Sequence, residues 1–285
     1  MQVETFKSTK DFLMSIENEN TRKTYKKALR CFCKLLKIED LDSLVENFNK
    51  SSKDGDDILK NFFNLMKENN FAPKTIASWS SAVKKFLAFN GIKTNFSPKI
   101  KVKTVFEDNI PNDEILKEIM ENCELRTKAI MLLLLSGLSV KEILELKIKN
   151  FKKNEVPKIV FENGKVILIT DDTAKTIEFY IKSRKEFGHE INEDSFLIST
   201  TDNRKLSYQT LQYLLNREFK KRVEKIGKRY RLRPTTLRKI FFEKISKTKI
   251  PKVYIENILG KRKLNDEEVE EIERVFKEEM NLLKL

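Results

Sequence analysis

The sequence predicts a mainly helical protein with one small β-hairpin, an α+β chain in two domains. A length of 285 residues suits two domains better than one small core. Apolar residues recur at helical spacing over most of the chain. Asn163-Gly164, between two runs of β-branched residues, is the one strong strand signal. We expect a helical domain over residues 1–97, a basic linker over 98–110 and a second domain over 111–285.

The first hundred residues are predicted to be helical. The segment TRKTYKKALRCFCKLLKI places Tyr25, Leu29 and Phe32 at helical spacing, with basic residues opposite. The segment PKTIASWSSAVKKFLAFNGI begins with Pro73 in a first-turn position, where the missing N–H costs nothing. Between them, DILKNFFNLMKENN repeats the amphipathic pattern. The N-terminal domain should therefore be all-helical.

The helical pattern lapses in TNFSPKIKVKTVFEDNIP, residues 94–111. This stretch is basic, contains two prolines and alternates β-branched residues with lysines, which is typical of an extended linker. A helix then restarts in PNDEILKEIMENC, with Asn112 or Asp113 available as its cap and Glu114 in its first turn. The linker should thus separate two folded domains.

The second domain contains the predicted hairpin, KIVFENGKVILIT. Its Asn163-Gly164 pair favours a type I′ turn, in which both central residues take a positive φ. Lys165 directly follows the turn. Helical spacing resumes in DDTAKTIEFYIKSRKEF and again from residue 207 to the end, and no internal repeat interrupts it.

The charge balance favours a polyanionic partner. Lys plus Arg number 57 against 43 Asp plus Glu, the formal net charge is +14, and the pI is near 9.4. Such a chain suits nucleic acid, although simple solubility is the alternative. We expect no metal cluster and no cofactor, because the chain has only three cysteines and one histidine, His189. No apolar run is long enough to span a membrane, so we expect a cytoplasmic, nucleoid-associated protein.

Four motifs occur in a characteristic order along the second domain: LLLLSGLSVKEILELKIKNF, the hairpin with its lysine, PTTLRKIFF, and ILGKR. In this order the chain resembles the tyrosine recombinase family, the integrases and Xer-type enzymes. The resemblance implies a two-domain clamp on duplex DNA, with a helical core-binding, SAM-like domain before a catalytic-like domain. In that family a tyrosine attacks the scissile phosphate, two arginines hold its oxygens, and a lysine or histidine protonates the leaving oxygen.

The resemblance carries over residue by residue, with departures. Gly137 and Leu138 match the family's first arginine motif, but Ser139 stands at the arginine position. Lys165 matches the hairpin lysine, and Arg238 matches the second arginine. These matches imply that Lys165 and Arg238 contact the DNA phosphate.

Further departures concern the proton donors and the nucleophile. Thr235 stands at the position of a histidine, and Lys261 follows the Leu-Gly pair where a histidine or tryptophan is usual. The last tyrosine of the chain is Tyr254, which precedes that motif, and Phe276 is the nearest aromatic residue to the nucleophile position. We therefore expect that the chain is not an enzyme. It is interpreted as an inactive relative that binds double-stranded DNA and organises it or regulates recombination.

Two alternatives stay open at this point. One is an active recombinase with an unconventional nucleophile, either Tyr254, Tyr230 or a tyrosine supplied by another subunit. The other is a protein-interaction scaffold that uses the tail helix. The tail, NDEEVEEIERVFKEEM, is strongly acidic and should repel a phosphate backbone, while its apolar stripe needs a groove on this molecule or on a neighbour.

The predicted contact residues form two sets. Basic and short polar residues on two N-terminal helices and near Arg238 are expected to bind DNA: Arg22, Lys26, Lys74, Ser78, Ser81, Lys85, Lys165, Arg238, Lys239, Lys261 and Arg262. Apolar residues of the tail helix are expected to contact protein, either another copy or a related active recombinase: Val269, Ile272, Phe276, Met280 and Leu283.

Overall fold

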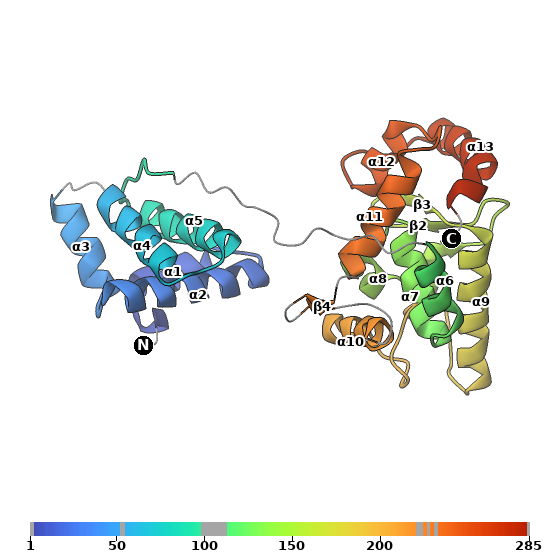
Figure 1. The fold of residues 1–285 in the computed structure, drawn as a ribbon, viewed down its shortest axis with the longest axis horizontal. Helices are drawn as coiled ribbons and strands as arrows, with labels where there is room; N and C mark the ends of the chain where they lie inside the picture. The colour runs from blue at the N-terminus through green and yellow to red at the C-terminus, as the bar shows by residue number, and fades with distance from the viewer. Residues whose placement is uncertain are drawn as a thin grey trace. The chain divides into compact units, whose positions relative to one another are not determined.

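The computed structural model describes residues 3–51, 55–97, 113–220, 225–226, 229–230 and 233–283. The chain divides into two compact units, Met1–Val105 and Phe106–Leu285 (Figure 1). The expected linker over residues 98–110 lies outside the described residues. The structure confirms the predicted fold class, because helices dominate and a small antiparallel sheet accompanies them.

The first unit is all-helical. Its elements are η1 (Val3–Thr5), α1 (Lys7–Met14), α2 (Glu19–Leu36), α3 (Leu41–Ser51), α4 (Asp56–Glu68) and α5 (Pro73–Phe89). Helices α2, α4 and α5 pack on one another around fully buried aromatic rings, among them Phe32, Phe62 and Phe86. The Asn18 side chain caps α2 by accepting a hydrogen bond from the Thr21 N–H at 3.0 Å.

The second unit combines helices with short strands. Its helices are α6 (Asp113–Glu121), α7 (Leu125–Leu135), α8 (Val140–Glu145), η2 (Ile148–Asn150), α9 (Asp171–Glu186), α10 (Tyr208–Phe219), α11 (Pro234–Ile245), α12 (Lys252–Ile258) and α13 (Asp266–Leu283). Its strands are β1 (Phe151–Lys152), β2 (Lys158–Val160), β3 (Val166–Leu168), β4 (Lys225–Ile226) and β5 (Arg229–Tyr230). Strands β1, β2 and β3 form one antiparallel sheet, and β4 pairs with β5.

Helix α7 is the centre of the second unit. It is apolar on most of its surface, as expected of a helix buried on several sides. Figure 1 shows it between α11 and α9, and it packs against both. Gly137 follows α7 with φ +92°, and a Cβ at this position would lie 2.6 Å from Cε1 of Phe241. Only glycine permits this backbone conformation together with such a close approach of α11.

The hairpin occurs where the sequence predicts it, but its turn differs. Val160 pairs with Val166, and the Phe161 N–H donates to the Lys165 carbonyl at 2.9 Å, which leaves a three-residue loop. Gly164 takes a positive φ, whereas Asn163 does not. The predicted type I′ turn is therefore wrong. A three-residue loop needs a left-handed residue only at its last position, and Gly164 occupies it.

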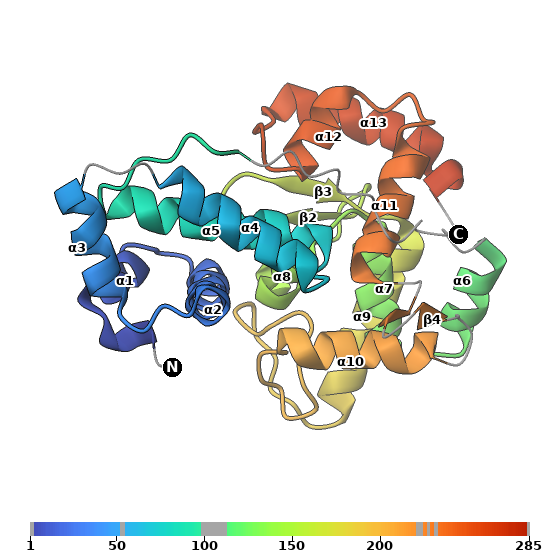
Figure 2. The same ribbon diagram turned by 60° about the vertical axis from the view of Figure 1, so that its left-hand side comes forward.

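Strand β3 is an edge strand that α12 covers with side chains. The Lys165 carbonyl and the Ile169 N–H form hydrogen bonds with the β2 segment. Because hydrogen-bonding direction alternates along a strand, the N–H groups of Val166 and Leu168 point to the free edge of the sheet. Two residues of α12 accept these hydrogen bonds: Asn257 Oδ1 from Val166 at 3.0 Å, and the Tyr254 hydroxyl from Leu168 at 2.7 Å. Figure 2 shows α12 and α13 together on this side of the sheet.

The tail helix α13 lies on its own unit. It contacts α11 and β3, and Ile272 and Phe276 are buried in the core of the second unit. Lys158 and Glu273 form an ion pair at 2.5 Å. For Ile272 and Phe276, the groove that the apolar stripe needed is therefore on this molecule, whereas the side chains of Met280 and Leu283 lie outside the described residues.

Candidate functional site

The Arg238 side chain is fixed at Nε and open at its two terminal nitrogens. Its Nε donates a hydrogen bond to the Gly137 carbonyl at 2.7 Å, and its guanidinium carbon lies 5.3 Å from the centre of the Phe242 ring. Within the described part of the chain, its two terminal nitrogens donate no hydrogen bond. The side chain is half-buried. A guanidinium oriented in this way presents its outer pair of nitrogens to an anion.

Exposed residues flank Arg238 on α11. Thr235 lies three residues earlier, on the same side of the helix, and Lys239 follows directly. Pro234 in the first turn of α11 and the buried Thr236 and Leu237 orient this end of the helix toward the core. The hydroxyl of Thr235 is therefore available beside the guanidinium.

Ser139, Glu142 and Lys165 form a second cluster. The Ser139 hydroxyl caps α8 by accepting from the Glu142 N–H at 3.3 Å, and the Glu142 carboxylate accepts from the Ser139 N–H at 2.7 Å. The same carboxylate pairs with Lys165 Nζ. Burial alone would raise the pKa of Glu142, but the hydrogen bonds from Lys165 and Ser139 outweigh it, and the pKa lies below its ordinary value. Ser139 thus contributes a helix cap and no charge.

Lys165 is less accessible than the hairpin pattern suggests. Only 6% of the residue is exposed, because its side chain folds back from the turn toward α8. Its Nζ lies 5.7 Å from the centre of the Phe161 ring. The charge of Lys165 is therefore balanced by Glu142 in this structure.

The loop after α12 lies beside the hairpin. Gly260 takes a positive φ and turns the chain, and Lys261 is exposed without a side-chain partner among the residues described. Arg262 pairs with Glu268 of α13. The Lys263 side chain passes over the turn, since its Cδ lies 3.5 Å from the position of a Cβ on Gly164. Sequence reasoning missed Lys263, although the basic run GKRK could have indicated it.

The structure brings three of the predicted positions of the second unit together. Gly137 and Glu142 link Arg238, Ser139 and Lys165 through consecutive contacts. Phe276 does not join them, because its ring is 1% exposed and packs in the hydrophobic core.

Tyr254 also lies away from the open part of the site. It is fully buried, and its hydroxyl accepts the Leu168 N–H. Burial raises the pKa of this hydroxyl well above its ordinary value, although the hydrogen bond lowers it in part. Tyr230 belongs to β5, and its side chain lies outside the described residues.

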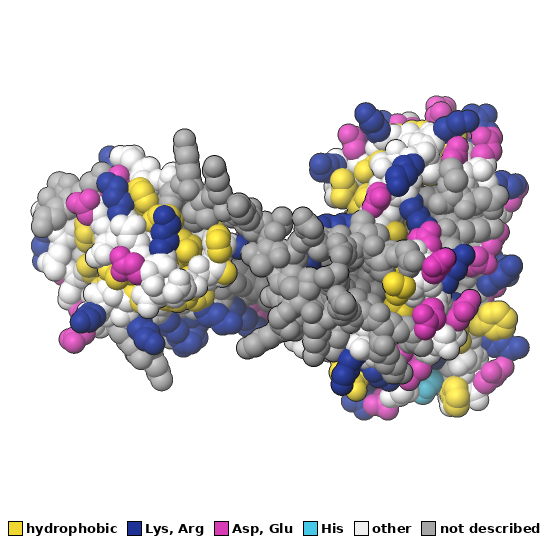
Figure 3. All heavy atoms as spheres, viewed as in Figure 1, with side chains coloured by type: hydrophobic (Ala, Val, Ile, Leu, Met, Phe, Trp, Pro, Cys, Tyr) yellow, Lys and Arg dark blue, Asp and Glu magenta, His cyan; other side chains and the backbone are white. Residues whose placement is uncertain are grey.

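The N-terminal positions lie on two adjoining helices. Lys74, Ser78, Ser81 and Lys85 are exposed on one face of α5. Lys85 Nζ lies 5.7 Å from the centre of the Tyr25 ring, which places this end of the face beside α2. Figure 3 shows Lys and Arg side chains along the lower edge of this unit.

Arg22, a basic residue of α2, has a partner in this unit. The Arg22 guanidinium donates to the Ile16 carbonyl from Nε at 3.1 Å and from Nη2 at 2.5 Å, so it also fixes the loop between α1 and α2. Lys26 is half-buried. Arg22 is therefore a structural residue in addition to any role toward a ligand.

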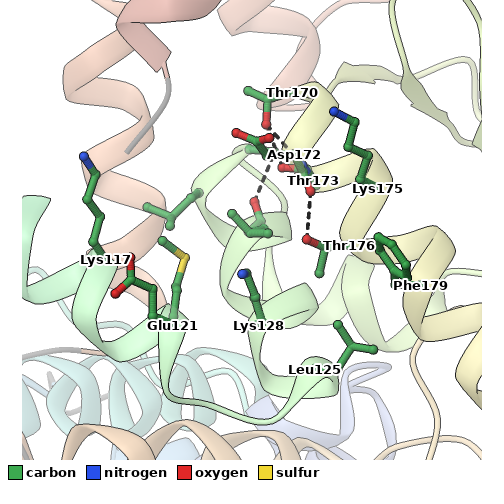
Figure 4. Close-up of a pocket in the computed structure, with 14 residues that line it drawn as sticks. Lys117, Glu121, Leu125, Lys128, Thr170, Asp172, Thr173, Lys175, Thr176 and Phe179 are labelled. Atoms are coloured by element: carbon green, nitrogen blue, oxygen red, sulfur yellow. Dashed lines mark hydrogen bonds between the residues drawn. The ribbon is translucent and has the colours of Figure 1, made fainter.

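A pocket of about 550 Å³ lies between α6, α7 and α9 (Figure 4). Lys117, Lys128, Lys175 and Phe179 are among the residues that line it, and none of the predicted site residues is. The described residues hold no group of three or more His, Cys, Asp or Glu side chains that could bind a metal ion. In the same parts of the chain, no helix is long and apolar enough to cross a membrane.

Comparisons with solved structures show one fold. The XerH site-specific recombinase in a post-cleavage complex with palindromic difH substrate matches with a TM-score of 0.61 and 14% identity, over 90% of this chain and 80% of that one. A lambda integrase tetramer bound to a Holliday junction matches with a TM-score of 0.60 and 14% identity, over 91% and 76%. The Tn1549 transposon integrase with transposon right end DNA matches at 0.57 and 16%, over 77% and 84%.

Comparison at the level of sequence identifies the family. No curated protein matches the chain. The model of the phage integrase family, in contrast, matches residues 109–267, more than half of the chain. The prediction that the chain is not an enzyme is wrong, because the family that this model describes is one of DNA integrases. The chain belongs to the phage integrase family.

Proposed function

We propose that this protein binds double-stranded DNA and acts in DNA recombination. The observation that carries the proposal is Arg238, whose guanidinium is fixed by the Gly137 carbonyl and keeps its outer nitrogens open. Family membership supports it, as do structural relatives that were solved on their DNA substrates. Assembly of several copies on one DNA is part of the proposal, because the lambda integrase relative is a tetramer on a Holliday junction.

In this proposal a backbone phosphate lies at the tip of Arg238. A guanidinium donates two parallel hydrogen bonds to a phosphate, and such charge-assisted bonds are about twice as strong as neutral ones. The Thr235 hydroxyl supplies a further donor on the same face of α11, and Lys261 supplies a positive charge from the loop after α12. The Lys165–Glu142 pair carries no net charge, so it orients the site more than it attracts DNA.

The N-terminal unit is proposed to add contacts to the phosphate backbone. Its exposed face on α5 carries two lysines and two serines, and short serine side chains let a helix approach a groove closely. Affinity should then come chiefly from neutralised phosphates and fall steeply as salt is added.

Strand cleavage within this proposal requires a nucleophile, and the tyrosines of the second unit differ in how accessible they are. Tyr254 is the last tyrosine of the sequence, and its hydroxyl is buried and bonded. Tyr208 and Tyr213 of α10 are 51% and 63% exposed, and Tyr230 follows them in β5. A tyrosine of another copy on the same DNA is a further candidate. Phenylalanine substitutions at Tyr208, Tyr213 and Tyr230 show which of these tyrosines, if any, forms the covalent adduct.

The experiment measures binding to a long duplex across a salt series, and the same mixtures are run on denaturing gels for covalent adducts. Arg238→Ala should weaken binding about tenfold to a hundredfold, since a hydrogen bond to a charged group contributes about 1.5–3 kcal/mol. Lys182→Ala on α9 is the matched control, because it removes an exposed charge away from the site. Equal effects of both substitutions, or no binding by the unsubstituted chain, would contradict the proposal.

A further inference from the structure

One buried amide connects the hairpin with the loop after α12 that carries Lys261. Asn257 is 1% exposed, and its Oδ1 accepts the Val166 N–H at 3.0 Å. Its Nδ2 donates to the Arg262 carbonyl, also at 3.0 Å. Val166 directly follows Lys165, and Arg262 directly follows Lys261. A single side chain therefore holds the backbone next to both lysines.

The loop that carries Lys261 has other anchors besides this amide. The Arg262 guanidinium pairs with Glu268 of α13, and the Leu264 side chain packs against the hydrophobic core of the second unit. The Lys261 N–H donates to the Glu256 carbonyl at 2.9 Å, so the start of the loop is tied to the end of α12. Beyond it, the Arg262 carbonyl is bonded to Asn257 and the Lys263 side chain covers Gly164 of the turn. The Lys263 side chain joins the loop to the hairpin directly. The Asn257 amide of α12 joins the two through its pair of hydrogen bonds, so it is the polar link between them.

We infer that Asn257 is a positioning residue that couples the hairpin to the Lys261 loop and so presents Lys261 to a DNA backbone. The inference rests on the proposed function and deepens it. Lys261 is exposed, and its side chain has no partner in the described residues that could orient it. Its contribution to binding depends on where the loop lies, because a mobile loop must be ordered on binding at a cost in free energy.

Tyr254 provides a matched comparison on the same helix. It lies one turn before Asn257, is also buried, and accepts a hydrogen bond from the same strand at Leu168. Among the residues that the structure describes, it makes no hydrogen bond to the Lys261 loop. Tyr254→Phe therefore removes one bond between α12 and the edge of β3 and leaves the loop attached. Asn257→Leu removes the bond to the strand and the bond to the loop together.

The test compares Lys261→Ala in three backgrounds: the unsubstituted chain, Asn257→Leu and Tyr254→Phe. Duplex binding is measured at one moderate salt concentration, below the melting temperature of every variant. Loss of one phosphate contact should weaken binding about fivefold in the unsubstituted chain and again in Tyr254→Phe. In Asn257→Leu the same substitution should change binding by less than about twofold, because the loop no longer presents the lysine.

Hydrogen exchange tests the coupling without DNA. Asn257→Leu should speed exchange at the Val166 amide and at the amides of the Lys261 loop together, whereas Tyr254→Phe should speed exchange at Leu168 and spare the loop. The inference is wrong if Lys261→Ala has its full effect in Asn257→Leu, or if Tyr254→Phe abolishes that effect as well. No DNA binding by the unsubstituted chain would refute the proposed function, and with it the role of Asn257 toward DNA. The exchange result would then decide the coupling by itself.

Discussion

The contact between Gly137 and α11 yields a prediction about both stability and the site. Gly137→Ala would place a Cβ 2.6 Å from Cε1 and 2.8 Å from Cδ1 of Phe241, closer than such atoms approach in proteins. It would also force alanine into a left-handed backbone conformation at φ +92°. The left-handed conformation costs roughly 1–2 kcal/mol, and overpacking of a core adds about 1–3 kcal/mol. We expect a total loss of about 2–5 kcal/mol.

Gly188→Ala is the control that separates these two costs. Gly188 has φ +83°, and a Cβ there would meet nothing within 4 Å. This substitution should lower the free energy of unfolding by the conformational cost alone, about 1–2 kcal/mol. Denaturant unfolding of both variants gives the comparison. If Gly137→Ala destabilises the protein no more than Gly188→Ala does, the close approach of α11 does not constrain this residue and the reasoning fails.

The same substitution bears on Arg238. The Gly137 carbonyl accepts its Nε hydrogen bond, so a displacement of α11 from this turn should also displace the guanidinium. We expect Gly137→Ala to weaken DNA binding even where the variant is fully folded. Gly188→Ala should bind like the unsubstituted chain.

Two further substitutions test the buried ion pair and the tail helix. Glu142→Gln leaves Lys165 buried without a counter-charge and should destabilise the protein by about 3–5 kcal/mol at neutral pH, as measured by denaturant unfolding. Folding lowers the pKa of Glu142 from an ordinary value of 4.5, so the stabilisation by its carboxylate is present above that pH and lost as the pH falls below it. The difference in free energy of unfolding between Glu142→Gln and the unsubstituted chain should therefore shrink in acid. Phe276→Ala should cost about 3–5 kcal/mol by leaving a cavity, and a loss below 1 kcal/mol in thermal unfolding would show that α13 is not part of the core.

Local patterns in the sequence predicted most of the helices and the position of the hairpin. They failed at the turn, because Asn-Gly is compatible with more than one loop length and the pairing of Phe161 with Lys165 decides between them. They also failed to show that Ser139 caps α8, although Glu142 three residues later is the usual sign of a capping box.

The contacts that build the site join residues far apart in the chain. Lys165 is 23 residues from Glu142, and Asn257 is 91 residues from Val166, so no periodic pattern reports either contact. The acidic tail likewise makes contacts that local sequence patterns do not report. Its carboxylates were expected to repel DNA, but Glu268 and Glu273 pair with Arg262 and Lys158 of the same unit, which neutralises part of that charge.

The cover on the edge of β3 has a consequence for the newly made chain. The β2–β3 hairpin is local and can form as soon as it emerges from the ribosome, since hairpins close in roughly 1–10 μs. The amide of Val166, however, waits for a partner 91 residues downstream. At a synthesis rate of about 5–20 residues per second, the strand edge stays open for on the order of 5–20 s. During that interval the nascent chain presents an unpaired edge to its neighbours, and this is when strand-to-strand aggregation would compete with folding.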